Sequence, residues 1–286
     1  MRVVTDPAAM RDLSRRARAR GERIAFVPTM GALHEGHLEL MRRGAKGHDR
    51  LAVSVFVNPL QFGPREDFRR YPRNRRRDAA LCRSAGCDWL FAPRARSLYP
   101  SGFATTVSPG ALGARWEGAV RPGHFAGVLT VVLKLLNLVE PDTLILGQKD
   151  AQQAAVVGAM MRDLDLAPRL DVAPIVRERD GVALSSRNAY LNAGQRARAA
   201  GLPRALRTAA AAARSGERSA ARITAAARAT LRRETQPDAV DYFAVVDPKT
   251  FLPIRRLERR SLLIAAIRIG RTRLIDNRFI TPGGRA

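Results

Sequence analysis

The sequence predicts an α/β fold, in which a parallel β-sheet is layered between helices, followed by a smaller α+β region. Near-continuous apolar runs at 51–57 and 143–146 suit strands buried on both faces, which is typical of parallel sheets. Helical patterns separate these runs, as in βαβ units. Past about residue 190 the chain becomes rich in Ala and Arg, and apolar strands follow. We therefore expect two domains, 1–176 and 177–286.

Length and composition are those of a globular protein. The chain has 286 residues, of which 46% are hydrophobic, enough to bury a core in one large or two unequal domains. The longest apolar run, 128–139, is interrupted by Lys134 and is too short to span a membrane. The N-terminus lacks an apolar signal core, and Cys82 and Cys87, expected within one helix, do not suggest a disulfide framework. These features predict a cytoplasmic protein with no membrane partner.

The charge is unusual, with a formal net charge of +24. A balance this basic is common in proteins that bind nucleic acid. The excess comes from arginine spread through every segment, and the only lysines are Lys46, Lys134, Lys149 and Lys249. Aromatic residues make up only 6%, whereas sites for single-stranded nucleic acid interleave aromatic with basic side chains. We therefore attribute the charge to composition bias and expect no nucleic-acid partner, although the charge can steer anionic substrates inward.

The first half of the chain alternates predicted helices and strands. Asp6 is a favourable N-cap and Pro7 suits the first helical position, so a helix should begin there. Pro28 and a glycine-punctuated turn should end the first strand. In chain order we expect helix 7–20, strand 24–27, helix 38–46, strand 51–57, helix 78–85 and strand 89–91. The arginine-dense connection 64–77 suits a lid or gate, and 94–122 should be irregular.

The second half continues this alternation and then changes character. His124 either lines a cleft or starts the next helix. A buried helix over 128–139 should stop before Pro141, because proline cannot continue a helix interior. The first domain should then end with strand 143–146, helix 151–161 and strand 169–176. Strong helix formers and then apolar runs follow. The small domain should contain helices 193–213 and 219–234, strands 239–246 and 262–267, and a closing segment 274–277.

Met30–His37, which we call the histidine turn, lies where the first predicted strand gives way to a helix. Unpaired backbone N–H groups at a helix N-terminus, together with the helix dipole, favour phosphate. Gly31 and Gly36 let the backbone approach a ligand closely. The imidazoles of His34 and His37 can donate hydrogen bonds to phosphate oxygens as charge develops. A His-x-x-His pair can also bind metal, but no Cys or second acid cluster nearby completes a zinc site.

Polar side chains also follow two later strands. Gln61 lies after strand 51–57, at the edge of a parallel sheet where ligands bind, and its amide suits a substrate with carboxylate and hydroxyl groups. A loop-capping amide is an equally good interpretation. Gly147–Asp150 follows the next such strand, where Lys149 can neutralise phosphate and Asp150 can accept from ribose hydroxyls or support Mg²⁺. The spacing of a Walker motif is absent.

A third polar group comes after the last strand of the first domain. Ser185, Ser186 and Arg187 put two hydroxyls and a guanidinium in tandem, which suits a compact triphosphate clamp. The alternative is that the serines only cap the helical turn that leads to Tyr190.

These motifs together resemble the pantothenate synthetase family. The resemblance covers nearly the whole chain and depends on four segments in order: the histidine turn, Phe56-Val57-Asn58-Pro59-x-Gln61-Phe62, Gly147-x-Lys149-Asp150-x-Gln152-Gln153 and Ser185-Ser186-Arg187-Asn188. The His-x-Gly-His ending is similar to that of the adenylyl-transferring superfamily that includes class I aminoacyl-tRNA synthetases. The resemblance implies a Rossmann-like, doubly wound nucleotidyltransferase domain with a smaller C-terminal α+β lid domain, usually in a homodimer.

Members of this family join pantoate and β-alanine with ATP and Mg²⁺, giving pantothenate, AMP and pyrophosphate through a pantoyl-adenylate. The resemblance assigns ATP binding to Met30, Gly31, Ala32, Leu33, His34, Glu35, Gly36, His37, Gly147, Gln148, Lys149, Asp150, Val176, Leu184, Ser185, Ser186 and Arg187. It assigns catalytic roles to His37, the implied proton donor, and to His34, Lys149 and Arg187. Pantoate is assigned to Gln61 and Gln153, and β-alanine to Gln61. The Mg²⁺ is expected to be carried by ATP, with no protein ligand assigned.

The chain departs from the family pattern beside the phosphate-contacting residues. The family often has Glu and an aromatic residue where this chain has Gln148 and Ala151, and Met where it has Leu184. These departures bear on affinity more than on activity.

Two other classes of function remain open from the sequence. A cytidylyltransferase-like enzyme would release a stable nucleotidyl product and need no amine substrate. A nucleic-acid-binding protein on the same fold would explain the charge, but it should lack the pair Gln61 and Gln153. A tRNA synthetase is disfavoured, because no large anticodon-binding region fits after residue 190.

Overall fold

The computed structural model describes residues 1–64 and 66–283, which divide into two compact units. The first unit is Met1–Gly147 with Val156–Pro174, and the second is Gln148–Ala155 with Ile175–Ala286. The functional division at residue 176 stays a prediction.

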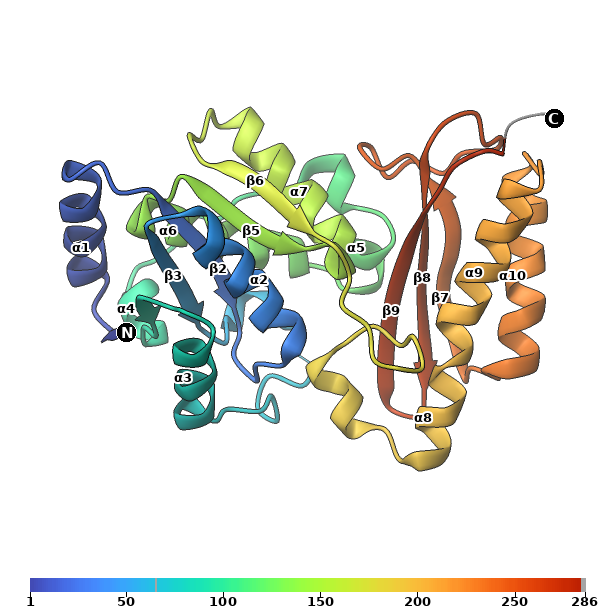
Figure 1. The fold of residues 1–286 in the computed structure, drawn as a ribbon, viewed down its shortest axis with the longest axis horizontal. Helices are drawn as coiled ribbons and strands as arrows, with labels where there is room; N and C mark the ends of the chain where they lie inside the picture. The colour runs from blue at the N-terminus through green and yellow to red at the C-terminus, as the bar shows by residue number, and fades with distance from the viewer. Residues whose placement is uncertain (65, 284–286) are drawn as a thin grey trace. The chain divides into compact units, whose positions relative to one another are not determined.

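The first unit is built on a six-stranded parallel sheet (Figure 1). The strands are β1 (Arg2–Val4), β2 (Ile24–Thr29), β3 (Arg50–Val55), β4 (Trp89–Phe91), β5 (Thr143–Gly147) and β6 (Arg169–Ala173). Their order in the sheet is β1-β4-β3-β2-β5-β6, and every pair is parallel. The expected Rossmann-like, doubly wound α/β sheet is therefore confirmed.

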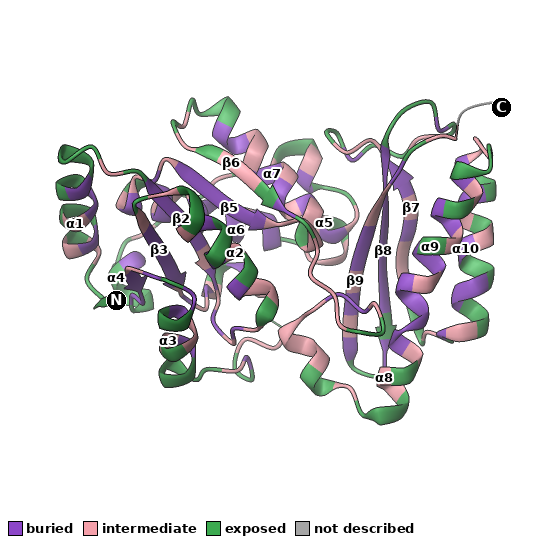
Figure 2. Cartoon of the chain, in the orientation of Figure 1, coloured by how far each residue is buried: buried purple, intermediate pink, exposed green. Residues whose placement is uncertain are grey.

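Helices cover both faces of this sheet, and the strands between them are largely buried (Figure 2). The unit contains α1 (Pro7–Ala19), α2 (Glu35–Gly47), η1 (Pro59–Gln61), α3 (Arg75–Ser84), α4 (Ala95–Leu98), η2 (Gly110–Gly113), α5 (Glu117–Val120) and α6 (His124–Val139). Side chains of α2 and α3 share one core with Ala25 and Val27. Because neighbouring residues of a strand face opposite ways, Phe26 points to the other face. There α6 packs against β2, and α1 packs against α6.

The strand order reverses between β2 and β5, since β3 and β4 lie on one side of β2 and β5 and β6 on the other. The carboxyl ends of β2 at Thr29 and β5 at Gly147 therefore lie at a topological switch point. Open α/β sheets bind ligands in the crevice outside such a point. The histidine turn begins at this edge of the sheet.

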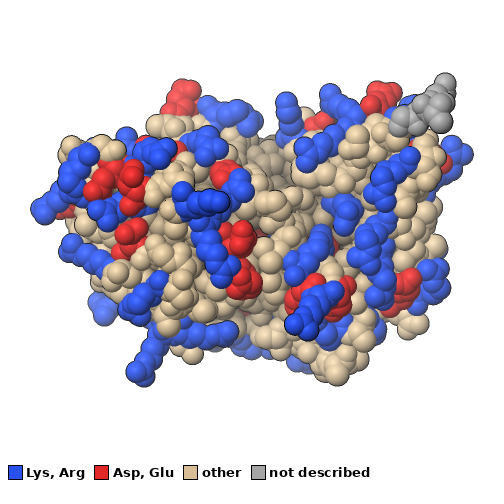
Figure 3. Space-filling view, viewed as in Figure 1, with Lys and Arg blue, Asp and Glu red and all other residues tan. Residues whose placement is uncertain are grey.

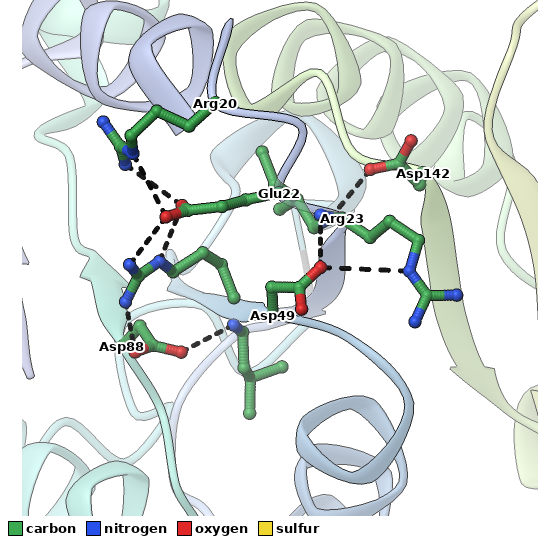
Figure 4. A network of polar contacts seen from close by, with 9 residues as sticks. Arg20, Glu22, Arg23, Asp49, Asp88 and Asp142 are labelled. Carbon is green, nitrogen blue, oxygen red and sulfur yellow. Dashed lines mark hydrogen bonds and ion pairs between the residues drawn. The ribbon is translucent and has the colours of Figure 1, made fainter. Parts of the chain in front are cut away.

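At the amino-terminal ends of the strands, carboxylates hold the backbone (Figure 4). Asp142 accepts the backbone N–H of Ile24 at 2.8 Å, where β2 begins. Asp88 accepts the N–H of Leu51 at 2.8 Å at the start of β3, and Asp49 accepts the N–H of Arg23 at 2.8 Å. These bonds satisfy donors that the parallel ladder leaves at strand starts, so they stabilise the sheet.

The second unit is a smaller α+β structure, as expected. It contains η3 (Gln148–Asp150), η4 (Ser186–Tyr190), α8 (Ala193–Ala199), α9 (Gly201–Arg214), α10 (Ala220–Glu234), β7 (Ala239–Val246), β8 (Ser261–Ile269) and β9 (Thr272–Ile280). Helix α7 (Ala151–Asp163) begins in this unit and returns to the first. The sheet is antiparallel in the order β7-β8-β9. Small residues of α9 such as Ala205 and Ala209 share its core with Leu263 and Ile267 of β8.

The structure corrects several sequence predictions. Pro28 does not end the first strand but lies inside β2, which pairs with β5 only at Ala25 and Phe26. Beyond Phe26, the side of β2 that faces β5 makes no further ladder hydrogen bonds. Pro28, which has no N–H, therefore costs no hydrogen bond at its position. Cys87 lies outside the helix of Cys82, because α3 ends at Ser84.

Other predicted boundaries also shift. The strand β1, which we did not predict, pairs with β4 at the edge of the sheet. Helix α6 begins at His124, before the buried run predicted from residue 128, which agrees with the interpretation of His124 as the start of the helix. The predicted irregular segment 94–122 contains the short helices α4, η2 and α5. Within the described part of the chain, no helix is long and apolar enough to cross a membrane.

Candidate functional site

The histidine turn leaves β2 in a conformation that favours glycine. Gly31 has φ 83° and Ala32 has φ 51°. A Cβ atom on Gly31 would lie 2.8 Å from Oδ2 of Asp78, so both backbone and space require glycine at this position. Two consecutive residues with positive φ turn the chain sharply toward the N-terminus of α2.

Asp78 of α3 holds this turn from behind. Its Oδ2 accepts the N–H of Ala32 at 3.1 Å, and its Oδ1 accepts the N–H of Leu33 at 2.9 Å. The residue is only 2% exposed. A buried carboxylate that accepts two backbone N–H groups makes strong, directional hydrogen bonds. Asp78 therefore stabilises the strained backbone on which both histidines are mounted.

The histidines are oriented by the start of α2. His34 is the N-cap of this helix, and its Nδ1 accepts the N–H of Gly36 at 3.2 Å. The Nδ1 of His37 accepts the N–H of His34 at 3.3 Å, and the two ring centroids lie 4.1 Å apart. Because Nδ1 accepts in each ring, a neutral imidazole carries its proton on Nε2. Both rings are thus set up as Nε2–H donors.

Gln61 lies close to the histidine turn in the first unit. It is buried, its Nε2 lies 3.2 Å from Sδ of Met30, and its Oε1 accepts from Nδ2 of Asn58 at 3.0 Å. Asn58 in turn donates to the carbonyl of Gly127 at 3.0 Å and accepts from Tyr99 at 2.8 Å. The Gln61 amide is therefore part of a buried network that reaches the histidine turn, and its role toward a substrate stays a prediction.

His124 supports the backbone of Gln61. Its Nδ1 lies 2.9 Å from the carbonyl oxygen of Gln61, and Nη1 of Arg121 lies 3.0 Å from its Nε2. Burial, with a further contribution from the Arg121 charge, lowers the pKa of His124 to about 4. A neutral ring that donates through Nδ1 to the carbonyl and accepts from Arg121 through Nε2 satisfies both contacts.

In the second unit, the turn η3 carries Gln148, Lys149 and Asp150. The Nζ of Lys149 lies 3.8 Å from Oδ2 of Asp150, which is exposed. Asn277 of β9 donates through Nδ2 to the carbonyls of Gln148 at 2.8 Å and Lys149 at 3.0 Å. Immediately after η3, α7 carries the buried Gln152 and the half-buried Gln153.

The other predicted residues of this unit lie along one hairpin-like loop. Leu184 donates its N–H to the carbonyl of Val176 at 3.0 Å, so these two predicted ATP residues lie side by side. Ser185 is the N-cap of η4, and its Oγ accepts the N–H of Arg187 at 3.3 Å. The capping interpretation of Ser185 is thus confirmed as a local contact. A clamp role for the three residues stays a prediction.

The structure reveals several supporting residues that sequence reasoning missed. These are Asn58, Asp78, Asp276 and Asn277. Asn58 belongs to a motif that we recognised, and a buried Asn beside Gln61 was a usable signal. Asp78 offered none, because an acidic residue in the first turn of a helix is usually a surface group.

The described residues contain no group of three or more His, Cys, Asp or Glu side chains placed to hold a metal ion. Asp150 does place one exposed carboxylate at η3, paired with Lys149.

Comparison with known proteins gives consistent matches over the whole chain. The family model described as pantoate-beta-alanine ligase matches residues 2–279. A pantothenate synthetase from Syntrophotalea carbinolica is 48% identical over 281 residues, which cover 98% of this chain and 99% of the relative.

Solved structures agree with this match. A crystal structure of pantothenate synthetase from Thermus thermophilus has a TM-score of 0.93 and 47% identity, covering 99% of this chain and 100% of that one. A crystal structure of pantoate-beta-alanine ligase from Francisella tularensis, complexed with beta-gamma ATP and beta-alanine, has a TM-score of 0.79 and 32% identity, covering 97% of each chain.

Proposed function

The chain belongs to the pantoate-beta-alanine ligase family, and from this premise we propose that it condenses (R)-pantoate with β-alanine through a pantoyl-adenylate, releasing AMP and pyrophosphate. The observation that carries this proposal is the histidine turn, which starts at the carboxyl end of β2 beside β5, where the strand order reverses. The complex of the Francisella tularensis relative with beta-gamma ATP and beta-alanine supports ATP and β-alanine as substrates.

We assign the residues to the substrates as follows. ATP is bound by Met30–His37 in the first unit, and by Gly147–Asp150, Val176 and Leu184–Arg187. Pantoate is held by Gln61 and Gln153, and Gln61 also serves β-alanine. The backbone of the histidine turn, its two Nε2–H donors and the ammonium of Lys149 are suited to phosphate oxygens.

An amine cannot displace oxide from a carboxylate, so the first step converts the pantoate carboxylate into an adenylate with a better leaving group. The carboxylate oxygen of pantoate attacks the α-phosphorus of ATP, and the bond from this phosphorus to the pyrophosphate oxygen breaks. Negative charge accumulates on the departing pyrophosphate, where Lys149, Arg187, His34 and His37 stabilise it. His37, the proposed proton donor, would act here by donating a hydrogen bond from Nε2–H to a pyrophosphate oxygen, because a neutral imidazole keeps that proton.

In the second step the amine of β-alanine attacks the acyl carbon of the adenylate. The amide bond forms, the bond from the acyl carbon to the phosphate oxygen breaks, AMP leaves, and the amine nitrogen gives up one proton to the departing phosphate. The adenylate hydrolyses readily, so exclusion of water matters more than any additional catalytic group. Positioning of three substrates contributes much of the rate, and no covalent bond to the enzyme is needed.

The residues present fit a magnesium ion that arrives with ATP. Mg²⁺ is usually held by one or two carboxylates together with substrate phosphates, and not by a dedicated protein cage. Asp150 could supply such a carboxylate beside Lys149. When bound, the metal neutralises charge on the triphosphate.

We further propose a cytoplasmic homodimer in which residues 177–286 act as a lid on the catalytic domain 1–176. The family resemblance supports these assignments. Light scattering coupled to size exclusion checks the dimer, since a mass near that of a single 31.4 kDa chain would contradict it.

The test of the proposed function is ATP turnover by the purified protein with Mg²⁺ and pantoate, with and without β-alanine. AMP and pantothenate should accumulate only when β-alanine is present. His37→Ala or Lys149→Ala should each lower kcat by roughly 100- to 1000-fold, as expected for the loss of a transition-state donor.

Matched controls come from the same residue types outside the site. His48 contacts the Gly44 carbonyl and Thr143 Oγ1, and Lys46 is exposed on α2, so His48→Ala and Lys46→Ala should keep near-normal kcat. Near-normal turnover in His37→Ala or Lys149→Ala would contradict the role given to that residue. No pyrophosphate release with pantoate would contradict the substrate assignment.

A further inference from the structure

Two adjacent residues of β9 hold both segments of the second unit that carry proposed ATP residues. Asn277 contacts the turn η3, and Asp276 contacts the loop that runs from Val176 to Leu184. Both are only 3% exposed. Neighbouring residues of a strand point to opposite faces, so one short stretch of β9 reaches two different segments.

The contacts of Asn277 involve its whole side-chain amide. Nδ2 uses its two hydrogens on the carbonyls of Gln148, at 2.8 Å, and Lys149, at 3.0 Å. Oδ1 accepts from Nε2 of Gln148 at 3.0 Å. The turn η3 is thus fixed by three hydrogen bonds to one buried side chain, and in two of them main-chain carbonyls of the turn accept from Asn277.

Asp276 holds the second segment through Arg177. The guanidinium of Arg177 donates to both carboxylate oxygens of Asp276, at 2.7 and 2.8 Å, and to the carbonyl of Gly181 at 2.9 Å. A bidentate pair of this kind fixes both distance and direction. Asp276 also accepts the N–H of Asn277 at 2.7 Å, which connects the contacts that hold η3 with those that hold the loop from Val176 to Leu184.

We propose that Asn277 is a positioning residue for the adenylation step. It fixes the main chain of the turn η3, and this turn carries Lys149, which stabilises the departing pyrophosphate. The inference rests on the proposed function, because it takes its meaning from the role of Lys149. A long lysine side chain has several rotatable bonds, so a fixed main chain is what limits the positions its ammonium can reach. Asn277 contacts the turn η3 that carries Lys149, and it needs no contact with substrate.

A purely structural role makes a different prediction. If Asn277 only stabilised the second unit, its loss would lower stability and leave kcat of the folded protein unchanged. If Asn277 positions Lys149, its loss should lower kcat in the folded protein and should no longer matter once Lys149 is gone.

The main variant is Asn277→Asp, which keeps the size of the side chain but removes both donors. Hydrogen exchange of residues 148–155 should become faster in this variant, and kcat should fall by about 10- to 100-fold, as for a catalytic group displaced by roughly an ångström. Asn277→Ser, which keeps one hydroxyl donor, should give an intermediate kcat. If Asn277→Asp does not fold, Asn277→Ser and Asn277→Ala give the same comparison.

The matched control is Asp241→Asn in the same three-stranded sheet. Asp241 pairs with Arg268 and Arg273 inside that sheet, so its substitution should leave kcat and exchange at 148–155 unchanged.

The decisive comparison uses the double variant. Lys149→Ala/Asn277→Asp should have the kcat of Lys149→Ala, because the second change has nothing left to misplace. Losses that multiply, an unchanged kcat in Asn277→Asp, or unchanged exchange at 148–155 would each overturn the inference. An unmodified protein that makes no pantothenate would contradict the proposed function. Hydrogen exchange at 148–155 tests the contacts of Asn277 with η3 independently, because it requires no activity.

Discussion

At the residue scale, the groups named by the sequence motifs depend on buried partners far away in the chain. The histidines lie where expected, because a strand, a glycine turn and a helix start are local patterns. Asp78 holds that turn from 46 residues away, and Asn277 holds Gln148 from 129 residues away. No local pattern reports such a pairing, since it is decided by which elements the tertiary fold brings together.

The first prediction concerns Asp78. Asp78→Asn keeps one acceptor but turns an NH₂ group toward one of the two backbone N–H groups of Ala32 and Leu33. Leaving a buried donor unsatisfied costs about 1–3 kcal/mol, and the histidine turn should shift. We expect a lower free energy of unfolding and a fall in kcat, measured by urea denaturation and steady-state turnover.

The control for Asp78 is a carboxylate that holds the start of β2, whereas Asp78 holds the turn that follows the end of β2. Asp142 accepts the N–H of Ile24, so Asp142→Asn should lower stability without a comparable change in kcat. If both variants change kcat equally, Asp78 acts on stability alone.

The second prediction concerns the pH dependence contributed by His124. The pKa of this ring is lowered from 6.5 to about 4, chiefly by burial and further by the Arg121 charge. Below pH 6.5 the unfolded chain takes up a proton that the folded chain resists. The corresponding stability is therefore complete above pH 6.5 and is lost as pH falls toward 4, by about 2–3 kcal/mol.

The measurement compares the protein with His124→Asn, whose amide can still donate to the Gln61 carbonyl but does not titrate. The stability advantage of the unsubstituted protein should shrink as pH falls from 6.5 toward about 4 in urea unfolding. Curves that stay parallel over this range would show that His124 keeps an ordinary pKa.

At the element scale, the pairing of α6 with η1 shapes the environment of Gln61. A Cβ atom on Gly127 would lie 2.3 Å from the carbonyl oxygen of Leu60 and 2.6 Å from the backbone nitrogen of Gln61. Backbone atoms cannot yield as a flexible side chain can, so only glycine lets these two elements approach this closely.

The third prediction follows from that approach. Gly127→Ala should push η1 away from α6, lower the free energy of unfolding by about 1–3 kcal/mol and raise the KM for pantoate. Gly158→Ala on α7 is the control, because its Cβ would meet flexible side chains, the nearest being Leu170 at 3.0 Å. If Gly127→Ala leaves the KM for pantoate unchanged, the position of η1 does not govern that site.

Elements were more predictable than contacts between them. The parallel strands stood out because burial on both faces removes polar residues, as in β3 and β5. The start of α6 at His124 was one of two open interpretations of that residue, because a polar side chain that is buried by tertiary contacts carries no local signal of its burial. The three-residue strand β1 was missed because it carries too little pattern and is stabilised by β4.

At the scale of the whole molecule, the basic charge is distributed over the surface, and part of it is paired locally with the 26 acidic residues. On the face drawn in Figure 3, Lys and Arg side chains are interspersed with Asp and Glu. Arg43 pairs with Asp171, and Glu22 accepts from both Arg50 and Arg20, which lowers the pKa of Glu22 to about 2. This pattern agrees with arginine as a general surface residue and leaves substrate steering as the long-range effect of the net charge.

The central claim is that a pantoate oxygen becomes bonded to the α-phosphorus of ATP. The most direct test uses pantoate with ¹⁸O in both carboxylate oxygens, with ATP, Mg²⁺ and β-alanine, followed by mass spectrometry of the products. We predict one ¹⁸O in each AMP and the other in the amide carbonyl of pantothenate. AMP without label, or label in inorganic phosphate formed together with ADP, would contradict the account.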